Sequence, residues 1–332
     1  MNSILVVGFG SIGKRHIENI LSNYDAQVIV CTKRIDLKSY QKKGVKVVHS
    51  LDEAFAYKPN IGFVTNETSY HIKTAVKLAN AGMDLFVEKP LSHSMQGVQK
   101  LYKIIQKKNL ITQIGCNMRF HPCIQKIKEV VDEGALGRIL SAQVESGSYL
   151  PDWHPYEDYR DGYAAKNNLG GGVALTCIHE VDYLYWFFGD IIKIFSVSGK
   201  YSDLTVTADD LTVMTLLFRN NIVGEIHLDY FQRPDFKSCK IKGTRGALYW
   251  DSVSNAVKIY TQNEKQWKTI LSLAHFERNA MYVDELHHFL KCVQKRTKTI
   301  NDITDGIKTL QIVLNAKKSS RLGKMIKIPY IV

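Results

Sequence analysis

The sequence predicts an α/β domain with a doubly wound parallel sheet, followed by an α+β domain built on an open, largely antiparallel sheet. The 332 residues are about twice the length of an ordinary domain. Up to about residue 120, short apolar runs alternate with helical periods. Beyond it, several strand-like stretches follow one another across short turns. We therefore expect two domains, residues 1–120 and residues 121–332.

The first domain is predicted to alternate strands and helices. Continuous apolar runs predict strands at residues 4–7, 28–31, 45–48, 61–64, 85–87 and 110–115. Helical spacing of apolar residues predicts helices at 12–24, 72–79 and 98–105. Thr68 or Ser69 can begin the middle helix and Gly82 can end it. Strands joined through helices form a parallel sheet.

The second domain is predicted to begin with a helix over 124–131 and a strand over 139–149. A polar, aromatic-rich loop over 151–168 then precedes an apolar helix over 173–188. Further strands are expected at 191–197, 211–218, 222–231, 237–242 and 247–250, followed by helices around 283–293 and 303–319. Short connections between consecutive strands indicate an antiparallel or mixed sheet.

The charge balance suggests an anionic partner, because 44 Lys and Arg against 32 Asp and Glu give a formal net charge of +12. Nucleic acid would require these cations in one stripe with stacking aromatic residues. The lysine pairs are instead scattered, at 42–43, 107–108 and 317–318. We therefore expect small anionic groups rather than nucleic acid.

Membrane embedding, secretion and a metal site are not indicated. Mean hydropathy is −0.16, and no apolar run approaches the roughly 18 residues of a spanning helix. Residues 1–10 are apolar but lack a charged leader, which indicates a strand and turn rather than a signal peptide. The six cysteines form no C-x-x-C pair and no zinc spacing, which indicates buried thiols in a reducing compartment. We expect a cytoplasmic protein.

Gly8, Gly10 and Gly13 spell G-x-G-x-x-G between a predicted strand and a predicted helix. The first glycine permits a tight turn, the second lets the backbone approach a pyrophosphate, and the third lets the helix pack on the strand. Free N–H groups at the helix start suit the anion. The motif predicts a Rossmann domain in which the cofactor-binding residues include Gly8, Phe9, Gly10, Ser11, Ile12 and Gly13.

The end of the second strand indicates which dinucleotide binds. NAD sites place Asp or Glu there to hold the ribose 2′-hydroxyl. This chain reads Thr32, Lys33 and Arg34, with two cations and no acid. Because these cations suit a 2′-phosphate, NADP(H) is favoured over NAD(H). The alternative is that Lys33 and Arg34 only form a solvated turn.

Further motifs resemble one family over essentially the whole chain. The glycine turn is followed by E-K-P at residues 88–90, by R-F-x-P at 119–122, and by G-G-G at 170–172 with His179 after it. In this order and combination they resemble the Gfo/Idh/MocA family, named for glucose-fructose oxidoreductase, inositol dehydrogenase and rhizopine catabolism. The family is one of two-domain NAD(P)-dependent oxidoreductases.

The resemblance implies cofactor contacts and two catalytic residues. Lys89 is similar to the family's active-site lysine, His179 resembles its catalytic histidine, and Pro90 is expected in a cis peptide bond. A histidine that titrates near neutral pH can accept the hydroxyl proton of an alcohol as hydride leaves the carbon. A lysine ammonium can stabilise the developing alkoxide. The cofactor contacts implied outside the glycine turn are Thr65, Asn66, His71, Glu88, Lys89 and Asn117.

The substrate side is expected in the second domain, where one position departs from the family. Thr176, His179 and Asp182 are spaced to share one helix face. The closely similar subgroup carries Asp at the position of Thr176, and threonine cannot carry that charge. Asp182 or Glu180 could supply a carboxylate instead, although Asp182 could equally be structural.

The loop over 151–168 resembles the same subgroup. Its aromatic side chains suit the apolar face of a pyranose, and Arg160 or Lys166 could bind a carboxylate or phosphate. The alternative is a loop whose aromatic residues pack on the sheet. The substrate-binding residues expected across the domain are Arg119, Trp153, Arg160, Tyr163, Thr176 and Asp182.

Together these features predict an oxidoreductase that moves hydride between NADP(H) and a secondary alcohol carbon of a sugar or nucleotide sugar, which could be anionic. The subgroup suggests surface-polysaccharide biosynthesis, and a homodimer or homotetramer is expected. Two alternatives stay open. One is a redox-neutral enzyme that oxidises a sugar transiently so that a glycosidic bond is eliminated. The other is a regulator that binds the cofactor without turnover.

Overall fold

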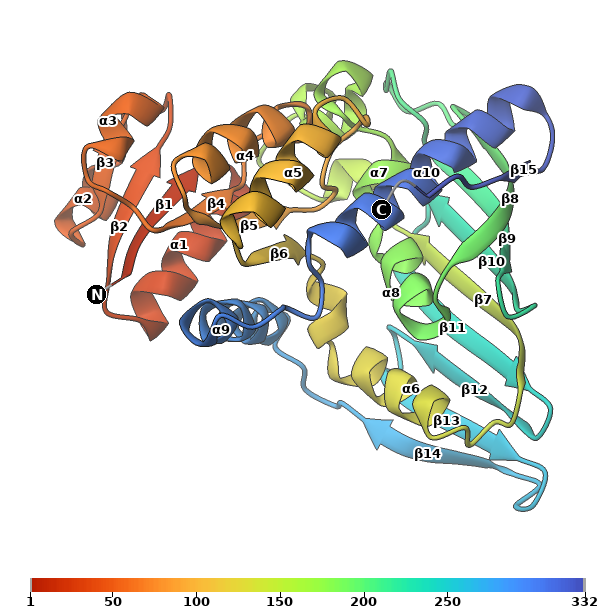
Figure 1. Ribbon diagram of the computed structural model, residues 1–332. Helices are drawn as coiled ribbons and strands as arrows, with labels where there is room; N and C mark the ends of the chain where they lie inside the picture. The colour runs from red at the N-terminus through yellow and green to blue at the C-terminus, as the bar shows by residue number, and fades with distance from the viewer. Residues whose placement is uncertain (1, 331–332) are drawn as a thin grey trace. The chain divides into compact units, whose positions relative to one another are not determined.

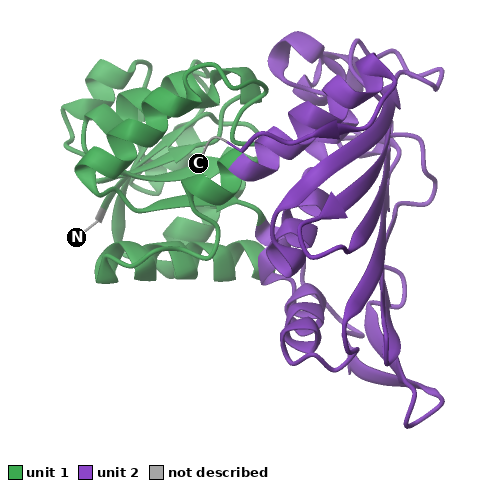
Figure 2. Cartoon of the chain, turned by 45° about the vertical axis from the view of Figure 1, so that its right-hand side comes forward, with its two compact units in different colours: residues 1–116, 279–307 green, residues 117–278, 308–332 purple. Residues whose placement is uncertain are grey.

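The computed structural model describes residues 2–330, which divide into two compact units (Figure 2). Within the described residues, unit 1 comprises residues 2–116 and 279–307, and unit 2 comprises residues 117–278 and 308–330. The sequence placed a single boundary at residue 120 and assigned residues 279–307 to the second domain. They belong to unit 1 because Leu286, Phe289 and Leu290 of helix α9 (Asn279–Lys295) are buried in its core.

Unit 1 is built on a six-stranded parallel sheet in the order β3-β2-β1-β4-β5-β6. This is the strand order of a doubly wound Rossmann sheet, which the sequence predicted. The strands are β1 (Asn2–Val7), β2 (Ala26–Cys31), β3 (Lys46–Val48), β4 (Ile61–Val64), β5 (Asp84–Glu88) and β6 (Thr112–Gly115). The helices besides α9 are α1 (Ser11–Asn23), α2 (Lys38–Lys42), α3 (Leu51–Phe55), the 3₁₀ turn η1 (Thr68–Tyr70), α4 (His71–Asn80) and α5 (Val98–Lys108).

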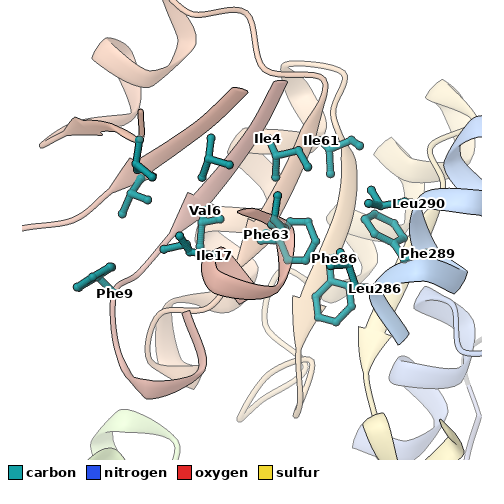
Figure 3. Packing of buried hydrophobic residues seen from close by; sticks show 14 of the residues in the cluster. Ile4, Val6, Phe9, Ile17, Ile61, Phe63, Phe86, Leu286, Phe289 and Leu290 are labelled. Carbon is teal, nitrogen blue, oxygen red and sulfur yellow. The ribbon is translucent and has the colours of Figure 1, made fainter. Parts of the chain in front are cut away.

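Aromatic side chains fix α9 on the sheet of unit 1 (Figure 3). Phe63 on β4 stacks on Phe86 on β5 with 4.8 Å between ring centroids, and Phe289 of α9 meets both rings edge-on. All three side chains are fully buried. Burying each contributes on the order of 1.5–3 kcal/mol, so α9 is an integral part of the unit.

Unit 2 is built on a nine-stranded mixed sheet in the order β14-β13-β12-β11-β7-β10-β9-β8-β15. β7 and β10 pair in parallel, and every other neighbouring pair is antiparallel among the described residues. The strands are β7 (Ile139–Gly147), β8 (Ile191–Gly199), β9 (Leu211–Phe218), β10 (Val223–Asp229), β11 (Phe236–Gly243), β12 (Gly246–Asp251), β13 (Ala256–Thr261), β14 (Trp267–Ser272) and β15 (Ile326–Lys327).

Helices pack on one face of this sheet (Figure 1). The α-helices are α6 (Pro122–Asp132), α7 (Val173–Thr176), α8 (His179–Phe188) and α10 (Ile303–Leu322), which begins in unit 1. The 3₁₀ turns are η2 (Asn117–Phe120), η3 (Leu150–Asp152), η4 (Tyr159–Asp161), η5 (Tyr163–Ala165) and η6 (Asn167–Leu169). Phe195, Val197 and Val213 on β8 and β9 are exposed, which leaves an apolar patch on this sheet.

The predicted single helix over 173–188 was wrong, because the chain leaves helical geometry between α7 and α8. Cys177 has φ −96° and ψ 39°. Thr176 therefore ends one helix and His179 begins the next, and the two do not share one helix face. The strands β13 to β15 and the short helices α2 and α3 were not predicted. Within residues 2–330 no helix has the length and apolar character needed to cross a membrane.

Candidate functional site

The glycine turn joins β1 to α1, and the exposed backbone at Gly10 has open space beside it, here named the Gly10 recess. Gly8 has φ +109°, and a Cβ there would lie 2.6 Å from the Asn66 nitrogen. A Cβ on Gly13 would lie 2.4 Å from Gly8 O, so α1 packs directly on the turn. At Gly10 a Cβ would meet nothing within 4 Å, so the fold itself does not require glycine there. The recess fits a cofactor phosphate, since among the described residues no side chain caps α1 and no acid occupies its first turn.

Thr32, Lys33 and Arg34 follow β2 at the edge of unit 1. Thr32 Oγ1 accepts a hydrogen bond from Arg34 N at 3.2 Å, and His49 Nδ1 lies 2.9 Å from Thr32 O. Lys33 and Arg34 are exposed, and neither forms an ion pair with a residue in the described range 2–330. Two cations without a counter-charge are therefore available to an anion at this position.

The segment after β4 is bonded to the glycine turn. Thr65 Oγ1 donates to Val7 O or Gly8 O, each at 3.1 Å. Asn66 Nδ2 donates to Thr74 Oγ1 at 3.0 Å, while Asn66 Oδ1 is buried and accepts no bond from a described residue. Leaving such an oxygen unsatisfied costs roughly 1–3 kcal/mol, so a donor group of a cofactor fits there. Thr65 thus supports the turn, and Asn66 presents an acceptor.

Glu88 fixes the turn that carries Lys89. His16 Nε2 lies 2.7 Å from Glu88 Oε1, and Lys89 N donates to Glu88 Oε2 at 3.2 Å. Gly115 leaves room for the carboxylate, since a Cβ there would lie 3.0 Å from its carbon and both oxygens. The Lys89 side chain is half-buried, and the Lys89–Pro90 peptide bond is cis, as expected. Both Glu88 oxygens are bonded within unit 1, and the predicted ribose contact stays a prediction.

His71 is the first residue of α4 and is 1% exposed. Its Nδ1 lies 2.9 Å from Pro90 O and its Nε2 lies 2.9 Å from Asn66 O. Burial lowers the pKa of His71, whereas the two carbonyl oxygens act to raise it. The ring nitrogens are thus used inside unit 1, which argues against the predicted direct contact between His71 and the cofactor.

Arg119 and Asp182 form a buried ion pair in unit 2. Arg119 Nε and Nη2 each donate to one Asp182 oxygen at 2.8 Å, and both side chains are 1% exposed. Both residues were predicted to bind substrate. Their burial against each other argues against that role and favours a structural one, because neither charge reaches the surface of the unit. Asn117, predicted to contact the cofactor, is 4% exposed in η2.

His179 is the one residue in the range 170–184 that is not buried, and the structure describes every residue of that range. The next residue, Glu180, is fully buried. Lys237 Nζ on β11 donates to Glu180 Oε1 and to Ser146 Oγ on β7, both at 2.6 Å. This network fixes the start of α8 against the sheet, while His179 itself is half-buried and its Nδ1 atom is buried.

Thr176 forms a neutral hydrogen-bonded pair with Tyr230. Thr176 Oγ1 donates to Gly172 O at 2.9 Å and lies 2.5 Å from Tyr230 OH, which in turn lies 3.4 Å from Ala164 O. Burial raises the pKa of Tyr230 well above its usual value, so the phenol keeps its proton. Thr176 is 2% exposed. Its burial and these hydrogen bonds argue against its predicted role in substrate binding, which stays untested.

Trp153 anchors the loop over 151–168. Its Nε1 donates to Ser148 Oγ at 2.7 Å, and its ring meets that of Tyr230 edge-on with 5.4 Å between centroids. Trp153 and Tyr163 are both half-buried. The loop thus packs on the rest of unit 2, which agrees with the alternative that its aromatic residues are packing residues. Part of the Trp153 ring and part of the Tyr163 ring stay accessible.

The loop cations predicted to bind an anionic substrate already face carboxylates. Arg160 donates to both oxygens of Asp158 through Nε at 2.9 Å, and Lys166 Nζ lies 3.2 Å from Asp161 Oδ1. The side-chain hydrogen bond from Arg160 lowers the pKa of Asp158 to about 2. With Arg119 also paired, the structure gives no support for an anionic sugar from these residues.

Three residues that bond predicted site residues were not assigned a role from the sequence: His16, Tyr230 and Lys237. The only signal for His16 was a histidine on the apolar face of a predicted helix. Tyr230 and Lys237 both lie within predicted strands, where nothing local distinguishes them. Their partners are 54 to 72 positions away along the chain.

Two family models match the chain. The model "Oxidoreductase family, NAD-binding Rossmann fold" matches residues 2–116. The model "GFO/IDH/MocA C-terminal domain" matches residues 124–249. The two matches are consecutive and their order agrees with the resemblance seen in the motifs.

Curated relatives and solved structures are similar to this chain over half or more of its length. Myo-inositol 2-dehydrogenase of Thermotoga maritima is 25% identical over 341 residues, which cover 98% of each chain. Levoglucosan dehydrogenase of Pseudarthrobacter phenanthrenivorans is 24% identical over 58% of this chain and 56% of the relative. A solved levoglucosan dehydrogenase in complex with NADH has a TM-score of 0.90 at 16% identity, covering 99% of this chain and all of that one. The WlbA dehydrogenase from Bordetella pertussis, in complex with NADH and UDP-GlcNAcA, has a TM-score of 0.84 at 20% identity, covering 99% of each chain. At these identities the structural likenesses show the fold.

Proposed function

The chain belongs to the Gfo/Idh/MocA family of oxidoreductases, and on that premise we propose that it transfers hydride between a nicotinamide dinucleotide and a secondary alcohol carbon of a sugar. The observation that carries the proposal is the recess at Gly10, which the fold leaves open before an uncapped helix start. The relatives named myo-inositol and levoglucosan dehydrogenase support a sugar or polyol as the substrate.

In the proposed reaction the bound nicotinamide accepts or supplies the hydride. The glycine turn would hold its pyrophosphate, and Asn66 would offer its buried oxygen to a donor group of the cofactor. His179 would accept the hydroxyl proton when an alcohol is oxidised, and Lys89 would stabilise the negative charge on the same oxygen. The proposal for His179 is supported by its accessibility within an otherwise buried range.

The proposed reaction is tested with the purified chain, NAD⁺ and NADP⁺, and a panel of inositols, aldoses, anhydrosugars and nucleotide sugars. We expect reduced nicotinamide to accumulate with at least one sugar, and Lys89→Met to lower kcat/KM with it by about 10²-fold or more. If no member of the panel is oxidised or reduced while the cofactor binds, the oxidoreductase proposal fails for these substrates. That result would favour the alternative of a regulator that binds the cofactor without turnover. The observation that supports this alternative is the uncharged Thr176–Tyr230 pair.

We propose NADP(H) as the preferred cofactor. The support is the pair of exposed cations, Lys33 and Arg34, which lack ion-pair partners among residues 2–330. The variant with Lys33→Ala and Arg34→Ala is expected to lose about tenfold or more in NADP⁺ affinity and to leave NAD⁺ affinity nearly unchanged, because only the 2′-phosphate carries the added charge. Dissociation constants of both cofactors measure this. Tighter binding of NAD⁺ than of NADP⁺ by the unaltered chain would contradict the preference.

We also propose a nucleotide sugar of surface-polysaccharide biosynthesis as the substrate. The partly accessible aromatic rings of Trp153 and Tyr163 support a pyranose. The likeness to a dehydrogenase in complex with UDP-GlcNAcA supports the nucleotide part only by analogy of fold. Activity with free sugars and none with their nucleotide forms would overturn this choice.

We propose that the protein is a cytoplasmic homo-oligomer that pairs through the sheet of unit 2. The exposed apolar side chains of Phe195, Val197 and Val213 support a covered surface there. The buried thiols, with no disulfide among the described residues, are compatible with a reducing compartment. Sedimentation of Val213→Lys tests the interface: the unaltered chain is expected to be a dimer or tetramer and the variant a smaller species.

A further inference from the structure

His71 connects two segments that the proposed function uses. One is the segment after β4 that contains Asn66, and the other is the turn after β5 that contains Lys89 and Pro90. The imidazole lies between their carbonyl groups, with Nδ1 2.9 Å from Pro90 O and Nε2 2.9 Å from Asn66 O. All of these residues belong to unit 1.

The protonation state of His71 follows from its two partners. A backbone carbonyl oxygen can only accept a hydrogen bond. A neutral imidazole carries one N–H, so it can donate to only one of the two oxygens, and the bare nitrogen would face the lone pairs of the other. An imidazolium carries two N–H groups and satisfies both. The contacts of His71 are therefore those of a charged ring.

Burial is the largest influence on the pKa of His71 and lowers it overall, so the second proton is inferred from the two acceptor contacts alone. Burial lowers the pKa of His71 by penalising the cation. Against it act the two carbonyl oxygens, the carboxylate of Glu88 on β5 and the carboxylate of Glu67 before η1. Glu88 is itself 7% exposed, so its charge is weakly screened by solvent. A buried cation beside a buried carboxylate is the arrangement that makes such a charge tolerable.

His16 provides a contrast on the other side of Glu88. Its Nε2 lies 2.7 Å from Glu88 Oε1, and its Nδ1 has no hydrogen-bond partner among residues 2–330. The ring packs against Phe63 and Phe86. Only one ring nitrogen of His16 therefore contacts an acceptor, whereas both ring nitrogens of His71 do.

We propose that His71 is a positioning residue that works as an imidazolium, holding the carbonyl groups of Asn66 and Pro90 together and so fixing the Asn66 amide relative to the turn of Lys89. Loss of its proton releases one of the two carbonyl groups. Only the link to cofactor binding rests on the proposed function, because the charge state is a property of unit 1 alone.

The charge state is measured by nitrogen NMR of the full chain labelled with ¹⁵N-histidine, from about pH 6 to about pH 9. His71→Gln and His16→Gln identify the two sets of signals by their loss. We expect both His71 nitrogens to carry a proton at the acid end of this range, and Glu88→Gln to move the loss of one proton to lower pH. A bare nitrogen on His71 throughout this range, as in a neutral ring, would overturn the proposal.

The positioning role is measured separately by cofactor affinity. His71→Gln can donate to one carbonyl group but not to both on opposite sides, and is expected to weaken NADP⁺ binding by about tenfold. His287→Gln, an exposed histidine on α9 of the same unit, is the matched control and should leave the affinity unchanged. Equal affinities of both variants would overturn the positioning role. A charged His71 in a chain that turns over no sugar would leave this inference standing and count against the proposed reaction alone.

Discussion

The two units form their functional regions in different ways. In unit 1 the predicted cofactor residues bond mainly to backbone atoms: Thr65 to the carbonyl groups of the glycine turn, and His71 to those of Asn66 and Pro90. In unit 2 the predicted substrate residues bond to side chains, as in the pairs Arg119–Asp182 and Thr176–Tyr230. Unit 1 thus leaves the backbone at Gly10 uncovered, whereas unit 2 fills its region with buried pairs.

This difference has a consequence for substitutions. In unit 1 a change at the recess should affect binding while the fold persists, because no protein atom occupies it. In unit 2 a change in a buried pair should affect folding first. All four tryptophans of the chain, Trp153, Trp186, Trp250 and Trp267, lie in unit 2, so their fluorescence reports the unfolding of that unit.

His179→Asn is expected to have the largest effect of the variants considered. It is an exception in unit 2, because it should lower activity without affecting folding. His179 is half-buried and its neighbours in the chain are buried. We expect kcat on the sugar identified from the panel to fall about 10²–10⁴-fold, since asparagine cannot accept the proton. The urea midpoint and the cofactor affinity should change little, because His179 is only half-buried and asparagine keeps a polar side chain of smaller size there. Steady-state kinetics and cofactor titration measure both.

The matched control is His275→Asn, an exposed histidine of the same unit. It should retain the kcat of the unaltered chain. A His179→Asn variant with full activity would remove His179 from the proposed reaction and leave unit 2 with only structural pairs.

Arg119→Ala tests whether the buried Arg119–Asp182 pair stabilises the fold of unit 2. It leaves the Asp182 carboxylate buried without its partner, which costs about 3–5 kcal/mol of unfolding free energy. Urea unfolding followed by tryptophan fluorescence measures the loss. Arg160→Ala, which breaks an exposed pair with Asp158, is the control and should leave the midpoint nearly unchanged. The double variant Arg119→Met with Asp182→Leu should regain most of the loss, and equal midpoints for Arg119→Ala and Arg160→Ala would contradict the structural role.

The sequence allowed much of unit 1 to be predicted because its elements are local. The strand before Gly8, the helix after it and the alternation of later strands and helices depend on residues close together in the chain. The six-stranded order then follows from the general topology of such domains. Gly8 and Gly13 were identified for the same reason, since each glycine meets a requirement of the backbone at its own position, whereas the use of Gly10 as a phosphate site stays a prediction.

The sequence did not reveal the pairs of unit 2 because they are not local. Arg119 and Asp182 are 63 positions apart, and each alone looks like a candidate ligand for a substrate. The return of α9 to unit 1 is equally non-local, since its apolar face would fit either core. The break at Cys177 between α7 and α8 has no glycine or proline to mark it.

His121 tests whether unit 2 also depends on an uncharged buried group. Its Nδ1 accepts a hydrogen bond from Cys123 N and caps α6. Burial, and then the ammonium of Lys237, lowers the pKa of His121 from 6.5 to about 4. Because the pKa of His121 is lower in the folded chain than in the unfolded chain, the neutral ring contributes to the free energy of unfolding. This contribution is fully present above about pH 6.5 and is lost as the pH falls towards 4. The loss amounts to about 3 kcal/mol over that window.

His121→Asn keeps a side-chain acceptor for the cap but does not titrate. Urea midpoints of unit 2 at about pH 7 and about pH 4 should therefore differ less in this variant than in the unaltered chain. An identical pH dependence in both would show that other groups, such as buried carboxylates, cause the acid loss.

Gly10→Ala is the smallest expected effect and the most direct test of the open recess. Gly10 has φ −78° and ψ −172°, which alanine adopts without strain, and its Cβ would meet nothing within 4 Å. The urea midpoint should therefore not fall. Cofactor affinity should fall about tenfold or more, because a methyl group would separate the pyrophosphate from the backbone N–H groups and charge-assisted bonds would be lost.

Gly13→Ala is the control with the opposite pattern: its Cβ would lie 2.4 Å from Gly8 O, so it should destabilise unit 1 before any cofactor is added. If Gly10→Ala bound cofactor as well as the unaltered chain, the recess would not be the phosphate site, and the contrast between an open unit 1 and a filled unit 2 would lose its functional meaning.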